Sequence, residues 1–207
     1  MDLHLNLDVD VVAFDYSGYG HSTGSPGEGS LKQGWGGYYS CTFVFSDMEA
    51  VYDYLLLHYS PSLVVLYGHS VGSVPVVHLA SVVHGLGGVV LQSPLRSGVS
   101  LLTGTAQPPP WYDVLNNLDR IGLVTCPVFI IHGTADVEVP LEHGVSLYEA
   151  CKVPYTPWWV PGGGHNDIDV LWSAAYFARL QAFLRDLRPR TRPRGYVSGL
   201  SESALGE

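Results

Sequence analysis

Short apolar runs alternate with longer amphipathic segments along most of this chain. Runs rich in β-branched residues and bounded by turn-forming residues predict buried strands, whereas apolar residues spaced three or four apart predict helices. The expected strands are Val9–Phe14, Leu63–Tyr67, Gly88–Leu91, Val128–Ile131 and Thr156–Val160. The expected helices are Ser46–Tyr59, which begins at a serine cap, Val71–His84, Leu141–Cys151 and Asp167–Leu187.

Strands that alternate with helices at this spacing form βαβ units, so the fold class is α/β with a mostly parallel sheet and helices on both faces. A chain of 207 residues normally forms one domain, which we place at residues 1–187. Residues 188–207 begin with a run of arginines and prolines that predicts a disordered C-terminal tail.

One internal stretch departs from this pattern. Residues 27–45 are rich in Gly, Tyr and Trp, show no period, and interrupt the spacing between the first strand and the first helix. A loop of this length without secondary structure is unusual inside a compact domain. We therefore expect a loop insertion outside the core, with a lid element over a functional site as the alternative.

The charge distribution excludes some classes of partner. The formal net charge is −9, and residues 1–178 hold only four Lys or Arg against sixteen Asp or Glu. An acidic body argues against binding to nucleic acid. With no apolar run of about 18 residues and no signal peptide at the start, we expect a cytoplasmic chain that contacts membranes only peripherally.

The three cysteines, Cys41, Cys126 and Cys151, lie far apart and form no C-x-x-C pair. Neither a disulfide framework nor a metal site has this spacing, so three free thiols are expected. The sequence implies no metal and no organic cofactor.

A G-x-S-x-G motif, Gly68-His69-Ser70-Val71-Gly72, lies between an expected strand and an expected helix. In that context the serine occupies a sharp turn that projects its hydroxyl above the sheet. Gly68 and Gly72 are expected to be required because a Cβ would clash in so tight a turn. The backbone N–H of Val71 would then face an oxyanion formed at Ser70.

A serine nucleophile needs a base, and the base needs an acid to orient it. Asp136 follows the strand Val128–Ile131, and His165 follows the strand Thr156–Val160 in a glycine-rich loop. Both therefore lie at the carboxyl ends of strands, where open α/β sheets hold their ligands. The predicted triad is Ser70, Asp136 and His165.

Other residues have simpler interpretations. Asp15 comes too early in the chain to be the acid, and Asp167 is more typical of a charge at the start of a helix. His69 and His132 flank strand ends, which indicates packed groups that support the site.

Five segments together resemble the alpha/beta hydrolase domain-containing protein 17 family over about residues 9–24 and 46–187. The matching segments are Phe14–Gly20, Tyr67–Pro75, Leu91–Gly98, Cys126–Asp136 and Gly163–Asp167. The resemblance implies an α/β-hydrolase fold and a serine hydrolase. Animal members of that family remove acyl groups from S-acylated cysteines, which implies an acyl-protein thioesterase here. The substrate would be an S-acylated protein or a small acyl ester.

The chain also departs from that family, which has strands and a His-Gly loop ahead of the strand at Val9–Phe14. That loop supplies the second oxyanion N–H. We therefore expect a sheet that lacks its N-terminal strands, with a gap beside Leu63–Tyr67, and a truncated chain that folds poorly and is nearly inactive alone. Two alternatives remain open: a serine peptidase or general carboxylesterase, and a catalytically impaired fragment that acts only by binding.

Overall fold

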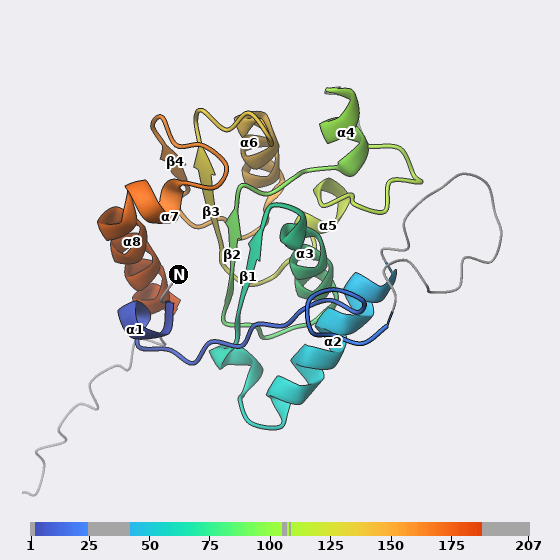
Figure 1. Ribbon diagram of the computed structural model, residues 1–207, viewed down its shortest axis with the longest axis vertical. Helices are drawn as coiled ribbons and strands as arrows, with labels where there is room; N and C mark the ends of the chain where they lie inside the picture. Colours follow the sequence, from blue (N-terminus) through green and yellow to red (C-terminus); the bar gives the residue numbers. More distant parts are fainter. Residues whose placement is uncertain (1–2, 25–41, 105–106, 108, 188–207) are drawn as a thin grey trace, which may run out of the picture.

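The computed structural model of this chain describes residues 3–24, 42–104, 107 and 109–187. In these residues one parallel sheet, in the order β1-β2-β3-β4, lies between helices on both faces (Figure 1). Its strands are β1 (Val65–His69), β2 (Gly88–Gln92), β3 (Val128–Gly133) and β4 (Trp158–Val160). The helices are α1 (Leu3–Leu7), α2 (Thr42–Leu56), α3 (Ser73–Val82), α4 (Gly98–Thr103), α5 (Leu118–Ile121), α6 (Leu141–Ala150), α7 (Ile168–Leu171) and α8 (Ser173–Leu187), with 3-10 turns η1 (Pro61–Leu63) and η2 (Ser70–Gly72).

Each strand pairs with the next strand along the chain, so the carboxyl ends of all four meet at one edge of the sheet. The register joins His69 of β1 to Gln92 of β2, and Gly133 of β3 to Val160 of β4. The loops that leave these four positions are therefore neighbours in space, although they are far apart in the sequence. This edge is where the predicted site residues gather.

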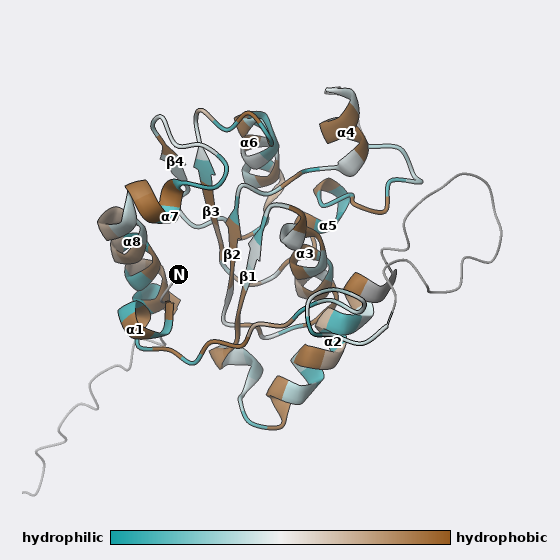
Figure 2. Ribbon diagram, viewed as in Figure 1, coloured by the Kyte–Doolittle hydropathy of each residue, from teal (hydrophilic) through white to brown (hydrophobic). Residues whose placement is uncertain are grey.

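Two apolar layers hold the helices onto the sheet. On one face, α2, α3, α5 and α6 cover the strands, and Val77, Leu91 and Leu147 are fully buried there. On the other face, Phe129 of β3 packs against Phe183 of α8 with ring centroids 5.5 Å apart. Figure 2 shows the strands mostly in the apolar colour, as expected for a sheet that is covered on both faces.

The strand expected at Val9–Phe14 is wrong. Residues 9–16 have no regular secondary structure, and Val11 and Val12 are about half exposed, at 47% and 51%. A β-branched run becomes a strand only where a neighbour satisfies its backbone groups, and no described strand pairs with these residues. Within the described residues the sheet therefore ends at β1, as an edge strand, and the expected gap between two strands is not present.

The first predicted helix begins earlier than expected. Helix α2 starts at Thr42, so Ser46 lies inside it and is not its cap. Phe45 packs against the buried cluster of Val74, Leu95 and Val139, and its ring lies 4.3 Å from that of His78. The end of the predicted insertion, residues 42–45, therefore belongs to the helix, and Phe45 contacts the core. The rest of the predicted insertion, residues 27–41, and the tail at 188–207 lie outside the described residues.

Further differences concern short helices. The predicted helix Asp167–Leu187 is two helices, α7 and α8, because Trp172 leaves the helical conformation at φ −114° and ψ 27°. Helices α1, α4 and α5 are absent from the sequence predictions, since four to six residues are too few to show a helical period. None of the described helices is long and apolar enough to cross a membrane.

The core predicts a sharp contrast between two leucines. Leu91 in β2 is 0% exposed and Leu102 in α4 is 87% exposed. We expect Leu91→Ala to lower the free energy of unfolding by about 2–5 kcal/mol, because it leaves a cavity in the apolar layer that also contains Val77 and Leu147. The control Leu102→Ala should change it by less than about 0.5 kcal/mol. Urea unfolding of both variants measures this, and equal losses would contradict the assignment of the core.

Candidate active site

Ser70 occupies the sharp turn that joins β1 to α3. Its φ is +54°, a left-handed conformation that costs a non-glycine residue free energy. Gly68 is required here, because a Cβ at that position would lie 2.7 Å from the carbonyl oxygen of Gly72. The same expectation for Gly72 is wrong: its φ is −61°, and a Cβ there would meet only the Tyr16 hydroxyl at 3.9 Å.

The structure brings the three predicted triad residues together. His165 Nε2 lies 2.9 Å from Ser70 Oγ, and His165 Nδ1 lies 2.8 Å from Asp136 Oδ2. Because the carboxylate accepts the proton on Nδ1, Nε2 presents a lone pair to the serine hydroxyl. The predicted contacts are therefore present, with the ring held in the tautomer that a general base needs.

Backbone groups fix the carboxylate of Asp136. Its Oδ1 accepts hydrogen bonds from the N–H of Glu138 at 3.0 Å and of Val139 at 2.8 Å. Burial alone would raise the pKa of Asp136, but the Val139 N–H and the His165 ring hold this pKa below its ordinary value. The residue therefore stays ionised with one oxygen directed at His165.

His132 supports the same carboxylate from β3. The ring is fully buried, its Nε2 donates to the carbonyl oxygen of Val139 at 2.8 Å, and Nε2 lies 3.5 Å from Asp136 Oδ2. Burial lowers the pKa of His132, so the ring is neutral at neutral pH. It therefore holds the turn that presents Asp136 without adding a positive charge.

His69 supports the loop that carries the base. Its Nε2 donates to the carbonyl oxygen of His165 at 3.1 Å, and the two rings lie 5.1 Å apart. Burial lowers the pKa of His69, so this ring is also neutral at neutral pH. The sequence interpretation of His69 and His132 as packed supporting groups is confirmed.

The carboxylates of the remaining candidates, Asp15 and Asp167, make their hydrogen bonds to backbone groups outside the triad. The Asp15 carboxylate accepts from the N–H of His21 at 3.0 Å, and Asp167 accepts from the N–H of Gly164 at 2.8 Å just before α7. Cys126 and Cys151 are buried free thiols, and burial raises the pKa of Cys126 to about 11. Among the described residues, no group of three or more side chains could hold a metal ion.

A family model described as the alpha/beta hydrolase fold matches residues 2–124, more than half of the chain. The chain belongs to the α/β-hydrolase family. It is 36% identical over 187 residues to human alpha/beta hydrolase domain-containing protein 17C, and 36% identical over 191 residues to the Xenopus tropicalis protein of that name. These matches cover 89% and 91% of this chain but only 52% and 56% of the relatives, so the chain spans about half their length.

Solved structures show the same fold at lower sequence identity. A monoacylglycerol lipase of Paleococcus ferrophilus matches with a TM-score of 0.61 and 20% identity, over 84% of this chain and 82% of the lipase. An esterase of Pyrococcus furiosus matches with a TM-score of 0.65 and 21% identity, over 89% of this chain and 72% of the esterase. At this level of identity the likeness concerns the fold.

Glu138 is a group near the reacting atoms of this α/β-hydrolase that the sequence interpretation missed. Its Oε2 lies 3.9 Å from His165 Nε2, and its Oε1 accepts from Asn166 Nδ2 at 3.1 Å. The carboxylate is 60% exposed, so it faces solvent at the mouth of the site. The sequence could have indicated this group, since Glu138 lies two residues after Asp136 and Asn166 lies one residue after His165.

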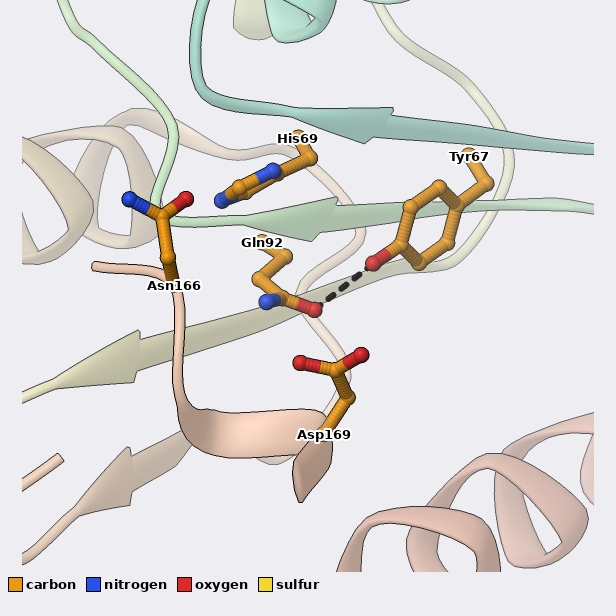
Figure 3. Close-up of a pocket in the computed structure, with 5 residues that line it drawn as sticks. All are labelled: Tyr67, His69, Gln92, Asn166 and Asp169. Carbon is orange, nitrogen blue, oxygen red and sulfur yellow. Dashed lines mark hydrogen bonds between the residues drawn. The ribbon is translucent and has the colours of Figure 1, made fainter. Parts of the chain in front are cut away.

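A polar pocket of about 300 Å³ lies beside the triad at the carboxyl ends of β1 and β2 (Figure 3). Its lining residues are Tyr67, His69, Gln92, Asn166 and Asp169. The sequence interpretation also missed Gln92, the last residue of β2. A polar residue that ends a buried strand at the ligand-binding edge could have indicated it.

His143 joins this group of buried histidines from α6. Its Nδ1 accepts a hydrogen bond from the backbone N–H of Arg96 at 3.1 Å. Burial, with the nearby positive charge of Arg96, lowers the pKa of His143 to about 4. The ring is therefore neutral in the folded protein wherever the pH is well above 4.

The glycines of the serine turn predict opposite responses to the same substitution. Gly68→Ala places a Cβ 2.7 Å from the Gly72 carbonyl oxygen and 2.8 Å from Ser73 Cα, so the turn must shift. We expect it to lose hydrolase activity by at least about 100-fold, because a displacement of about 1 Å suffices for that. Gly72→Ala has room for its Cβ and should keep activity within about threefold. Equal loss in both variants would show that the turn is not constrained by this contact.

His143 predicts destabilisation by mild acid. In the unfolded chain His143 has a pKa of about 6.5, whereas in the folded protein its pKa is about 4. The contribution of this residue to stability is therefore complete above pH 6.5 and is lost progressively as the pH falls from 6.5 to 4. His143→Asn keeps an acceptor for the Arg96 N–H but cannot be protonated in this range. Between pH 7 and pH 5 the wild type should lose about 2 kcal/mol more free energy of unfolding than this variant. Urea unfolding at both pH values tests this; parallel losses would contradict it.

Proposed function

We propose that this chain is a serine hydrolase that cleaves thioesters and esters through an acyl-enzyme at Ser70. The observation that carries the proposal is the pair of hydrogen bonds at His165. Its Nε2 lies 2.9 Å from Ser70 Oγ, and its Nδ1 lies 2.8 Å from Asp136 Oδ2. A hydroxyl at a strained turn, a base in the correct tautomer and an ionised acid are the parts that acyl transfer needs.

In the first half-reaction, His165 Nε2 takes the proton of Ser70 while Oγ attacks the carbonyl carbon of the substrate. Negative charge then develops on the carbonyl oxygen, and the N–H of Val71, in the first turn after Ser70, is our proposed donor to it. Collapse of this intermediate expels the leaving group, which takes the proton from His165. Water then repeats the sequence on the acyl-enzyme and releases a carboxylic acid.

The resemblance to the protein 17 family supports a thioester as the substrate bond, and the lipase and esterase neighbours support acyl esters. A second argument is physical. A thiol has a pKa of about 8.5 and leaves more readily than an amine, so a thioester demands less of the oxyanion site than a peptide bond does. With Val71 as the one donor assigned here, we favour an acyl-protein thioesterase over a peptidase. The substrate would be an S-acylated protein.

Labelling with a fluorophosphonate probe tests the nucleophile. The probe should modify the wild type and the control Ser81→Ala, which alters a serine bonded to His78 farther along α3, but not Ser70→Ala. Asp136→Asn should lower turnover of an octanoyl thioester by about 10⁴-fold, because it leaves His165 in the wrong tautomer. Absence of labelling in the wild type would favour the alternative of a catalytically impaired fragment that only binds.

Three substrates with the same octanoyl group, a thioester, an oxoester and an amide, then distinguish the possible substrate classes by their rates of hydrolysis. We expect the kcat/KM to fall from the thioester to the oxoester, and the amide to be hydrolysed at no measurable rate. Labelling at Ser70 together with amide cleavage at a rate similar to that of the thioester would instead support a peptidase.

A further inference from the structure

Gln92 is buried beside the catalytic residues, yet half of its side-chain amide has no partner. Only 3% of its surface is exposed, and its Oε1 accepts a hydrogen bond of 2.6 Å from the Tyr67 hydroxyl. No described residue accepts a hydrogen bond from its Nε2. The side-chain nitrogen borders the pocket beside the triad, so it is free to donate to a ligand there.

The orientation of this amide is fixed by two tyrosines. The Tyr67 hydroxyl lies 2.9 Å from that of Tyr176, and since Tyr67 gives its proton to Gln92, Tyr176 must donate to Tyr67. Burial strongly raises the pKa of Tyr67 and raises that of Tyr176 to about 12, so both hydroxyls keep their protons. The amide nitrogen of Gln92 therefore faces the pocket, as Figure 3 shows.

Two acceptors line the same pocket as this donor. The Asp169 carboxylate lines the same pocket and lies near Gln92 in Figure 3. His69 is neutral and carries its proton on Nε2, which donates to His165, so its Nδ1 is an acceptor. A ligand that fits must therefore accept one hydrogen bond and donate at least one, and a carboxylate is disfavoured by the charge of Asp169.

The pocket also has a defined place in the proposed reaction. His69 immediately precedes Ser70, and Asn166 immediately follows His165, so both residues that flank the proton transfer contribute to its wall. The leaving thiol takes its proton from His165 Nε2. A group held in this pocket is therefore close to the thiol side of the scissile bond.

We propose that this pocket is a subsite for a peptide amide next to the acylated cysteine, with Gln92 donating to its carbonyl oxygen and Asp169 accepting from its N–H. The inference rests on the proposed acyl transfer at Ser70 and names the group that the enzyme recognises on the leaving side. It makes the backbone of the substrate protein, in addition to the acyl chain, a determinant of specificity.

The first test compares two octanoyl thioesters, one of N-acetylcysteine methylamide and one of propanethiol, which has no amide. Gln92→Glu keeps an oxygen for the Tyr67 hydroxyl but replaces the free N–H groups with an acceptor. We expect it to lower the kcat/KM for the amide thioester about tenfold and to change that for propanethiol less than twofold. Gln181→Glu, the same change on α8 away from the triad, should affect neither. Equal losses on both substrates would overturn the subsite.

The second test does not depend on turnover. The side-chain NH₂ signals of Gln92, identified by their loss in Gln92→Glu, are followed by ¹H–¹⁵N NMR during titration with N-acetylcysteine methylamide. We expect these signals to shift in the wild type and the shift to weaken in Asp169→Asn, whereas propanethiol leaves them in place. If the amide leaves them unmoved, the subsite is wrong. If they shift but Ser70 forms no acyl-enzyme, the proposed function fails and the subsite stands.

Discussion

The strained turn at Ser70 is the constraint on which the rest of the site depends. The chain must leave β1 and enter α3 within a few residues, and it does so with Ser70 at φ +54° and with no space for a side chain at Gly68. Such a conformation persists only where its surroundings hold it. Here β2 pairs with β1 along its whole length, and α3 packs on β1 through buried residues such as Val77. The turn therefore depends on the core beneath it.

Two neutral histidines, His132 fully buried and His69 partly buried, hold the acid and the base. His69 fixes the backbone of His165, and His132 fixes the turn that contains Asp136, each through a hydrogen bond to a carbonyl oxygen. Because burial lowers the pKa of both rings, neither brings a positive charge that would compete with His165 for the Asp136 carboxylate. The imidazolium formed on His165 during acyl transfer would then be the dominant positive charge beside Asp136, which is the condition for stabilising it.

The sequence was sufficient to predict four strands, their parallel pairing and the grouping of Ser70, Asp136 and His165, because each depends on local apolar runs and on loops at strand ends. It failed where the outcome depends on distant partners. Val9–Phe14 has the composition of a strand but pairs with no described strand, and Gly72 has the motif of a required glycine but open space around it. Gln92 and Glu138 acquire their roles only from the contacts that the fold creates.

The strand that carries the nucleophile is an edge strand among the described residues, and side-chain hydrogen bonds add to the backbone pairing that holds it. On one side β1 is held by the backbone of β2, while its outer backbone groups pair with no described strand. Tyr67 ties β1 to Gln92 of β2 and to Tyr176 of α8, and His69 ties its end to the loop of His165. The same two residues line the pocket beside the triad. A ligand in that pocket would therefore contact the residues whose hydrogen bonds position the end of β1. Binding of the leaving group would in this way be coupled to the geometry of Ser70.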